Sequence, residues 1–475
     1  MDQQYIAYEE VLVNGYKTAL TLSTDGILRW NDNRNVLRCL SVEKEVVGVS
    51  TAGEQIIIKS FVENAGFCFG SFKPSLIRKS FVFEAVSDDS ISNLCDKIQG
   101  YIDSLGRPKK LFIFVNPFGG SKSASKVFTD DVKPLLQDAN VEYTLQETKY
   151  QLHAKEVSHK LDLTKYDGII CVSGDGILVE VVNGLLERED WQEAIKMPIG
   201  VIPAGTGNGM IKSLLHSAGQ PCTVAYAMLT AIRGHKRSLD VATIWQGETR
   251  FFSVLMLAWG LIADIDIESE RYRWMGSARM DIYGLQRMLR LRKYNGCISF
   301  VPAPGFENIG EPSSSGLESM EPPKPRHHGY RGPNVDLGSL SWRKLNGPFI
   351  GIWLQNVSWG SETAMAAPDA KFDDGYLDLI LMRDCPKLAL ISLMSEMSNG
   401  HYVRSPHVLY LKVQAVILEP GSRTGDSMKE GIIDSDGEVL ARGNGTYKCH
   451  LKSLMLYDRL QIVVDQGLAT LFTPL

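Results

Sequence analysis

The segment CVSGDGILVEVVNGLLE, residues 171–187, places one aspartate between two glycines, where an apolar run gives way to a helical pattern. The apolar run is typical of a buried strand. The apolar residues after Asp175 recur at helical spacing and predict a packed face that holds the preceding loop rigid; they are Ile177, Leu178, Val181, Val182, Leu185 and Leu186. The segment therefore predicts a strand, a glycine loop and a helix in succession.

Apolar strand runs alternate with helical patterns on both sides of this segment, from about Arg107 to Thr243. Such alternation predicts an open, mostly parallel sheet with helices on its faces. Ligands of these sheets gather beyond the carboxyl ends of the strands. Glycine- and asparagine-rich loops fall at those ends here, so we expect a ligand site there.

Three of these loops have the same construction: VNPFGGSKS (115–123), VSGDGI (172–177) and PAGTGNGM (203–210). Glycines let backbone amides approach a phosphate, and the following helix offers its positive end. The first loop lacks the glycine of a Walker A motif, and GTGNG is no dinucleotide fingerprint because its third glycine comes one residue early. Together the loops predict one nucleotide site.

Asp175 lies at the mouth of this predicted phosphate site, where a negative charge is electrostatically unfavourable. We interpret it as the group that accepts the proton of an attacking hydroxyl. The alternative is a helix N-cap, for which aspartate is a preferred residue. The two roles are compatible.

The remaining chain is richer in strands. Short β-type runs from Val11 to about Phe83 precede a helical pattern, which indicates either a pleckstrin-homology-like module or a β-rich accessory domain without that role. After the α/β zone, β-type runs predict a second, mainly antiparallel domain. We expect domains at 1–104, 105–245 and 246–475, with a Pro-, Ser- and Gly-rich disordered insertion at about 303–345.

Composition narrows the classes of function. The chain has 475 residues, 44% of them hydrophobic, and a net charge of -5, which favours a soluble multidomain protein and gives no basic excess for general nucleic-acid binding. Eight scattered cysteines without CxxC spacing favour a reducing compartment. The histidines show no metal-ligand spacing, and no GxSxG elbow indicates a hydrolase, so we expect no protein-bound metal site.

The apolar run FFSVLMLAWGLIA (251–263) leads directly into four acids. It is shorter than the roughly 20 residues that span a bilayer, so any membrane contact should be peripheral. An apolar pocket with a carboxylate at its mouth would suit a lipid with a cationic head. The alternatives are a plain core strand and a solvated helix face. The four acids are Asp264, Asp266, Glu268 and Glu270.

NPFGG (116–120), SGDGILVEVVNGLLER (173–188) and PAGTGNG (203–209) resemble the catalytic domain shared by diacylglycerol, ceramide and sphingosine kinases. LAWGLIADIDIESERYRWMGSAR (257–279) is similar to sphingosine kinases in particular, and RWMGSARMDIYG (273–284) is most similar to their plant versions. The resemblance covers about 110–465. It implies a diacylglycerol/NAD kinase-like α/β domain followed by a β-rich sandwich.

The resemblance also implies roles for individual residues. Asp175 would be the catalytic base. The substrate headgroup would lie near Ser173, Gly174, Asp175, Gly176 and Asp266. The nucleotide would contact Asn116, Pro117, Phe118, Thr148, Lys149, Tyr150, Gln151, Leu152, Glu180, Gly205, Thr206, Gly207, Arg273, Arg279, Asp436, Gly437 and Glu438. Many relatives carry lysine directly after the paired glycines, whereas here Ser121 precedes Lys122, which leaves the role of Lys122 open.

The implied activity is ATP-dependent phosphorylation of the primary hydroxyl of sphingosine and related long-chain bases, with Mg²⁺ arriving on the nucleotide. A ceramide or diacylglycerol kinase is one alternative, and the acid-rich stretch argues against it because a neutral headgroup needs no counter-charge. A non-catalytic lipid-binding protein is a second. We expect a cytoplasmic protein that visits membranes peripherally, the vacuolar membrane being a candidate in a plant cell, without nucleic-acid partners. The oligomeric state is open.

Overall fold

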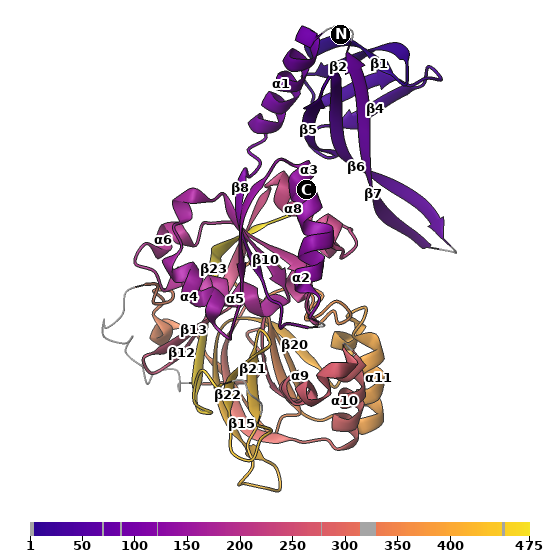
Figure 1. Ribbon diagram of the computed structural model, residues 1–475. Coiled ribbons are helices and arrows are strands. Elements are labelled where there is room, and N and C mark those ends of the chain that lie inside the picture. Colours follow the sequence, from indigo (N-terminus) through magenta and orange to yellow (C-terminus); the bar gives the residue numbers. More distant parts are fainter. Residues whose placement is uncertain are drawn as a thin grey trace.

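The computed structural model describes residues 4–68, 71–85, 88–120, 122–276, 278–313, 329–448 and 452–475. The N-terminal region forms a lobe of its own, built from a seven-stranded antiparallel sheet in the order β4-β3-β2-β1-β7-β6-β5 and one closing helix (Figure 1). Its elements are β1 (Tyr5–Val13), β2 (Tyr16–Ser23), β3 (Ile27–Asn31), β4 (Leu37–Ser41), β5 (Val46–Ala52), β6 (Gln55–Cys68), β7 (Ser71–Ala85) and α1 (Asp88–Ser104). The expected strands closed by one helix are confirmed.

Helix α1 closes the N-terminal sheet because Leu94, Ile98 and Ile102, four residues apart, form one apolar stripe. The stripe packs on strand residues such as Leu20 and Leu28. The lobe also contacts the α/β region. Arg107 donates to the carbonyls of Val42 (2.7 Å) and Val46 (2.8 Å), and Arg78 is ion-paired with Asp138.

The α/β region contains the predicted parallel sheet, with strands in the order β11-β10-β8-β9. Helices cover both faces, α4 and α5 on one and α2, α3 and α8 on the other (Figure 1). The elements are β8 (Lys110–Val115), α2 (Ala124–Val127), the π-helical turn η1 (Phe128–Val132), α3 (Lys133–Asp138), β9 (Glu142–Glu147), α4 (His153–Lys160), η2 (Leu163–Lys165), β10 (Gly168–Ser173), α5 (Asp175–Leu186), α6 (Trp191–Ala194), β11 (Ile199–Pro203), α7 (Gly209–Ser217) and α8 (Val224–Arg233).

The β-rich region is largely antiparallel, as predicted. Its elements are β12 (Lys236–Gln246), β13 (Thr249–Ser253), β14 (Met256–Gly260), α9 (Leu261–Glu268), η3 (Ser269–Met275), α10 (Ala278–Leu289), β15 (Tyr294–Pro302), β16 (Glu311–Pro312), η5 (Leu337–Ser339), β17 (Arg343–Asn346), β18 (Gly351–Gln355), β19 (Leu377–Met382), α11 (Lys387–Glu396), η6 (His401–Arg404), β20 (Leu409–Arg423), β21 (Ile432–Ser435), β22 (Glu438–Arg442) and β23 (Leu460–Phe472). Helices α10 and α11 lie side by side on this region (Figure 1) and were not expected from the sequence.

Strand β23 joins the two regions into one sheet. It runs antiparallel to β20 and β12, and near its end Leu471 pairs in parallel with Ile199 of β11. The C-terminus therefore returns to the α/β region (Figure 1). The edges of β14 and β21 are fixed relative to the glycine loops by this continuous sheet, and that arrangement sets up the cleft between the two regions.

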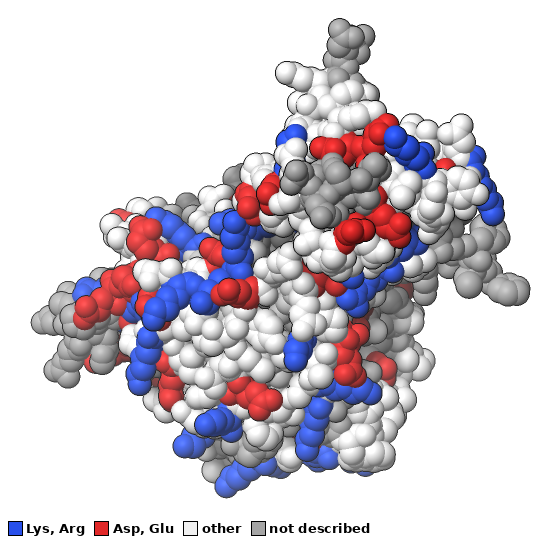
Figure 2. Space-filling model, turned by 45° about the horizontal axis from the view of Figure 1, so that its top comes forward, with Lys and Arg blue, Asp and Glu red and all other residues white. Residues whose placement is uncertain are grey.

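Residues 314–328, within the segment expected to be disordered, lie outside the described residues. The described residues on either side of this gap are anchored to the β-rich region. Before the gap β16 pairs with β17, and after it the Tyr330 hydroxyl donates to Asp465. Acidic and basic side chains are intermixed on the face seen in Figure 2. Among the described residues, every helix falls short of the length and apolar character needed to cross a membrane.

Candidate functional site

The three glycine loops meet at one edge of the sheet, because β8, β10 and β11 are neighbours and run parallel. The backbones touch closely. A Cβ atom on Gly205 would lie 2.3 Å from Cα of Gly174, and one on Gly120 would lie 2.9 Å from the carbonyl carbon of Gly205. Side chains at these positions would force the loops apart. The predicted convergence of the loops is confirmed.

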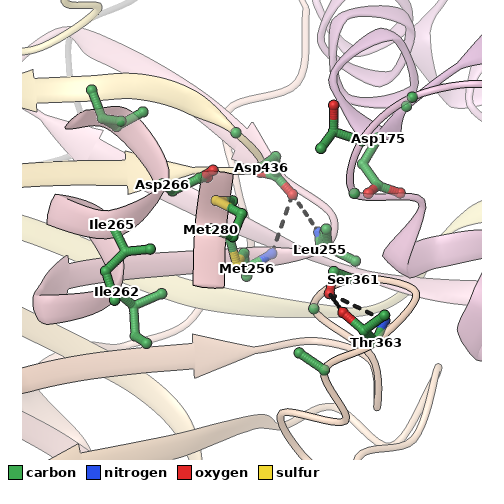
Figure 3. Close-up of a pocket in the computed structure, with 18 of the residues that line it drawn as sticks. Asp175, Leu255, Met256, Ile262, Ile265, Asp266, Met280, Ser361, Thr363 and Asp436 are labelled. Atoms are coloured by element: carbon green, nitrogen blue, oxygen red, sulfur yellow. Dashed lines mark hydrogen bonds between the residues drawn. The ribbon is translucent and has the colours of Figure 1, made fainter. Parts of the chain in front are cut away.

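A cavity of about 580 Å³ opens between these loops and the β-rich region. One end is polar and is formed by the glycine loops and several carboxylates. The other end is lined by apolar side chains of α9, α10 and α11, among them Ile262, Ile265, Met280, Met288, Leu390, Leu393, Met394 and Met397. Asp175 and Asp266 approach the cavity from opposite sides, with Asp436 between them (Figure 3).

Asp175 is the first residue of α5, and its carboxylate turns away from that helix. Gly174 is the N-cap of α5. The Asp175 oxygens instead accept the backbone amides of Gly209 (2.8 Å) and Met210 (3.0 Å), at the start of α7. The alternative that Asp175 caps its own helix is therefore wrong, because it caps the neighbouring one. Burial raises the pKa of Asp175 to about 6 in spite of these two hydrogen bonds.

Asp436 holds a tight turn beside the cavity. Its Oδ1 accepts the amides of Val254 (3.2 Å), Leu255 (2.5 Å) and Met256 (3.2 Å), two of which are drawn in Figure 3. Ser435 Oγ donates to its Oδ2 at 2.8 Å. Asp436 thus ties the loop between β13 and β14 to the end of β21, and burial still raises its pKa.

Glu438 and Glu180 connect the cavity to the segment 148–152. Gln151 Nε2 donates to Glu438 Oε2 at 2.5 Å, and burial raises the pKa of Glu438 to about 7. Glu180 accepts the amides of Leu152 and Ala154, both at 2.9 Å. The Glu180 oxygens are thus already engaged in fixing the start of α4.

Most of the predicted site residues line the cavity: Asn116, Ser173, Gly174, Asp175, Gly176, Glu180, Gly205, Thr206, Gly207, Asp266, Arg279, Asp436, Gly437 and Glu438. Others lie outside its lining: Pro117, Phe118, Thr148, Lys149, Tyr150, Gln151 and Leu152. Phe118 is 56% exposed on the first loop. Arg273 belongs to η3, but its side chain lies outside the described residues, as does Ser121. Lys122 follows at a left-handed φ of 59°.

The acidic run on α9 divides between two environments. Asp264 accepts Tyr294 Oη (2.6 Å) and Arg292 Nη1 (3.1 Å), whereas Glu268 accepts Arg292 Nη1 (2.9 Å) and the Tyr283 hydroxyl. Asp264 and Glu268 are 0% and 2% exposed, so the solvated-face alternative is wrong for them. Their spacing of four residues puts them on one side of the helix.

Asp266 and Glu270, the other two acids of this run, line the cavity. Glu270 is ion-paired with Arg279, which is 6% exposed, so the cation predicted to reach the phosphates carries a partner. Burial raises the pKa of Asp266. The carboxyl group that Asp266 faces belongs to Asp434 on β21, a residue that sequence reasoning missed.

Sequence reasoning also missed the apolar wall that α10 and α11 contribute. A signal was present, because Leu390, Leu393, Met394 and Met397 recur at helical spacing. No comparable signal marked Asp434. Its approach to Asp266 depends on how β21 packs against α9.

Comparisons with known proteins agree with this architecture. The family model "Diacylglycerol kinase catalytic domain" matches residues 110–244, and "YegS C-terminal NAD kinase beta sandwich-like domain" matches residues 351–457. The solved structure described as "a putative diacylglycerol kinase from Bacillus anthracis str. Sterne" superposes with a TM-score of 0.50 at 19% identity, over 77% of this chain and 98% of the bacterial chain. At that identity the likeness shows the fold alone.

Two curated relatives span nearly the whole sequence. Sphingosine kinase 2 of Arabidopsis thaliana is 58% identical over 98% of this chain and 96% of its own length. Sphingosine kinase 1 of the same plant is 58% identical over 99% of this chain and 96% of its own length. Identity at this level over nearly the whole chain places it in the sphingosine kinase family.

Proposed function

We propose that this kinase transfers the γ-phosphate of ATP to the primary hydroxyl of sphingosine and related long-chain bases, giving sphingoid base 1-phosphates. The observation that carries the proposal is the opposition of Asp175 and Asp266 across one cavity that is polar at the loops and apolar beyond α9 (Figure 3). A single-chain amphiphile fits this cavity, because its head, with a hydroxyl and an amine, suits the polar end and its chain suits the apolar end.

Asp175 is the proposed general base. In its ionised form it accepts the proton of the attacking primary hydroxyl, while its hydrogen bonds to Gly209 and Met210 fix the direction of the carboxylate. A pKa of about 6 suits this role, because the group is largely ionised near neutral pH and is still basic enough to take a proton.

The glycine loops are proposed to hold the nucleotide. Their amides and the start of α5 offer partial positive charge to phosphate oxygens. Arg279 and Arg273 are proposed to add fixed cations, with Glu270 as the partner that Arg279 exchanges for phosphate. Phosphoryl transfer depends mainly on such positioning and charge stabilisation.

Mg²⁺ is proposed to arrive on the nucleotide and to neutralise charge on its phosphates. Among the described residues, no group of three or more His, Cys, Asp or Glu side chains is placed to hold a metal ion.

Asp266 is proposed to recognise the substrate amine. An ammonium group in a pocket of low dielectric is costly unless a carboxylate offsets its charge. Ceramide, whose amide is uncharged, would leave this carboxylate without a counter-ion. The site should therefore prefer free bases over ceramide and diacylglycerol.

We further propose peripheral contact of a cytoplasmic enzyme with a membrane, the vacuolar membrane being a candidate in a plant cell. Exposed apolar side chains on α10 and α11 support this, since the same helices wall the apolar end of the cavity. They are Ile282, Leu285, Leu289 and Leu388, with exposed fractions of 51%, 45%, 55% and 83%.

The test of the activity is a panel of sphingosine, phytosphingosine, ceramide and diacylglycerol offered with labelled ATP. We expect label in the two free bases and little in the two neutral lipids. Preferential labelling of ceramide or diacylglycerol would overturn the substrate assignment, and absence of turnover with every lipid would favour a non-catalytic lipid-binding protein.

A further inference from the structure

Asp434 is a buried carboxyl group without an ordinary partner. It lies on β21 opposite Ala258 of β14 and is 0% exposed. Neither of its oxygens accepts a hydrogen bond from any N–H or hydroxyl donor among the described residues. A buried carboxylate left in this way is costly unless it is neutralised or paired.

The group that Asp434 faces is another acid, Asp266, on helix α9, which packs against β21, and Asp266 itself lines the cavity. The other charged groups that raise the pKa of Asp434 are also acidic, namely Asp436 and Glu438. Around Asp266 they are Arg279 and Glu270, and these two are ion-paired with each other. The protein therefore offers the two facing carboxyl groups no free cation of its own within the described residues.

We propose that Asp434 is a positioning residue for amine recognition: Asp434 and Asp266 share one proton in the empty site, and the arriving ammonium group of the substrate displaces that proton to solvent. This inference rests on the proposed function and deepens it.

Two carboxyl groups in contact cannot both ionise in a dry site, so the empty pair carries one negative charge and one proton. The shared proton forms a hydrogen bond that holds the Asp266 carboxyl in place. When a cation of charge +1 binds, the second carboxyl ionises and one proton leaves, so that charge is conserved. Burial and the Asp266 carboxyl together hold the pKa of Asp434 well above its usual range, as such a pair requires.

The consequence is a link between binding and pH. A ligand that displaces one proton binds up to about tenfold more tightly for each unit of rising pH, over the range in which the empty pair keeps its proton. A neutral headgroup leaves the proton in place, so its affinity does not increase with pH. The pair would thus sharpen the preference for free bases over acylated ones.

The test is calorimetric titration of the full-length protein, without ATP, with a short-chain sphinganine below its aggregation concentration. The titration is repeated in phosphate and in Tris near pH 7, because the buffers differ in ionisation enthalpy and their comparison counts the protons exchanged. For the wild type we expect net release, about one proton more than from Asp434→Asn. Asparagine can still donate to Asp266 but has no proton to lose.

Asp434→Asn should also bind the base about tenfold more weakly near pH 7 and flatten the pH dependence of Kd, with kcat at saturating base close to wild type. Asp175 and Glu438 are present in both proteins, so the difference belongs to the pair. The matched control is Asp465→Asn. Asp465 is a buried acid on β23 that accepts Thr243 Oγ1 (2.8 Å) and Tyr330, outside the cavity lining, and it should leave the proton count unchanged.

An equal proton count for the wild type and Asp434→Asn overturns the inference. If Asp434→Asn does not fold, the proton count of the wild type is the test, since binding of the base without proton release also overturns the inference. Failure of the proposed function looks different: the wild type would neither bind sphinganine nor phosphorylate sphingosine. An enzyme that phosphorylates sphingosine normally but releases no proton retains the function and loses only the inference.

Discussion

Two sets of buried acids lie within the β-rich region and its cleft, and they have different surroundings. The paired acids, Asp264 and Glu268, bind Arg292 and two tyrosines, although Asp264 Oδ1 accepts no hydrogen bond among the described residues. The second set is Asp434 together with four acids that line the cavity, namely Asp175, Asp266, Asp436 and Glu438. Their hydrogen-bond donors are backbone amides, the Ser435 hydroxyl and the Gln151 amide, and none of these acids is ion-paired with a described Lys or Arg side chain.

Burial of a carboxylate therefore does not by itself mark a functional site. What separates the two sets is whether the fold supplies the counter-charge. Burial alone would raise the pKa of Glu268, but hydrogen bonds from Tyr283 and Arg292 leave it lowered. The pKa of Glu438 is raised to about 7 by burial, with Gln151 as its hydrogen-bond donor. We propose that Asp266 is the acid left for a charge that arrives with a ligand.

The largest expected effect is that of Asp175→Asn, which keeps the shape of the side chain and removes the basic charge. General-base contributions run to about 10²–10⁴-fold in rate, so turnover of sphingosine should fall by that factor. Equilibrium binding of ATP should survive, because the glycine-loop amides are untouched. Near-normal turnover would mean that the base lies elsewhere.

Asp266→Asn should act on substrate binding. Removal of one partner of a buried charge pair costs on the order of 2–5 kcal/mol, which corresponds to a rise in KM for sphingosine of at least about 30-fold. The affinity for ATP should hardly change. The measurement is a steady-state titration of each substrate at saturating concentration of the other. An unchanged KM would remove the main physical support for amine recognition.

Asp264→Asn is the matched variant on the same helix, and its effect should be on stability. It leaves Arg287 and Tyr294 without their carboxylate partner, and breaking a buried ion pair costs about 3–5 kcal/mol, nearer the lower end here because Arg292 keeps Glu268. Denaturant unfolding should show the loss while KM stays near wild type. The opposite pattern, with recognition damaged by Asp264→Asn and spared by Asp266→Asn, would exchange the roles of the two acids.

The pH dependence should also distinguish the sets. A pKa of about 6 for Asp175 predicts that kcat falls about tenfold per pH unit below pH 6, as the base becomes protonated. A kcat that stays constant from pH 7 down to pH 5 contradicts the assignment.

The same pKa affects the stability of the fold. Because this folded-state pKa lies above the ordinary value of 3.8, the group stabilises the fold most below about pH 4, and that contribution is lost as pH rises through about 6.

The smallest effect on chemistry is expected from deletion of the N-terminal lobe before about Ser104. Activity on detergent-dispersed lipid should be largely retained, since none of the lobe's described residues lines the cavity. Binding to liposomes should weaken if the lobe contributes to membrane contact. Unchanged sedimentation with liposomes would assign the lobe a structural role, in line with its contacts through Arg78 and Arg107.

The α/β region was predictable because its signals are local. Each strand, glycine loop and helix is contiguous in sequence, and parallel neighbours bring loop ends to one edge whatever the rest of the chain does. Asp175 could be found in this way. Its hydrogen bonds to the start of α7 could not, because Gly209 and Met210 approach it only through the packing of two loops.

The second half was less predictable for the same physical reason. The β-type runs were recognised, but α10 and α11 were not, although their apolar spacing is helical. The return of β23 to the edge of β11 links residues near Leu471 and Ile199, and no local pattern specifies such a pairing.

The sequence by itself therefore determined the alternating α/β unit, the three phosphate-type loops, the position of Asp175 and the acidic run after an apolar strand. Only the tertiary structure decided which acids of that run bind arginines. Asp264, Glu268 and Glu270 do so, and Glu270 lines the cavity together with Asp266. Asp264 and Asp266 are two residues apart and so point about 200° apart around helix α9, and the partner of Asp266 comes from a distant strand. Charge pairing at a buried site depends on distances between elements, and folding alone sets those distances.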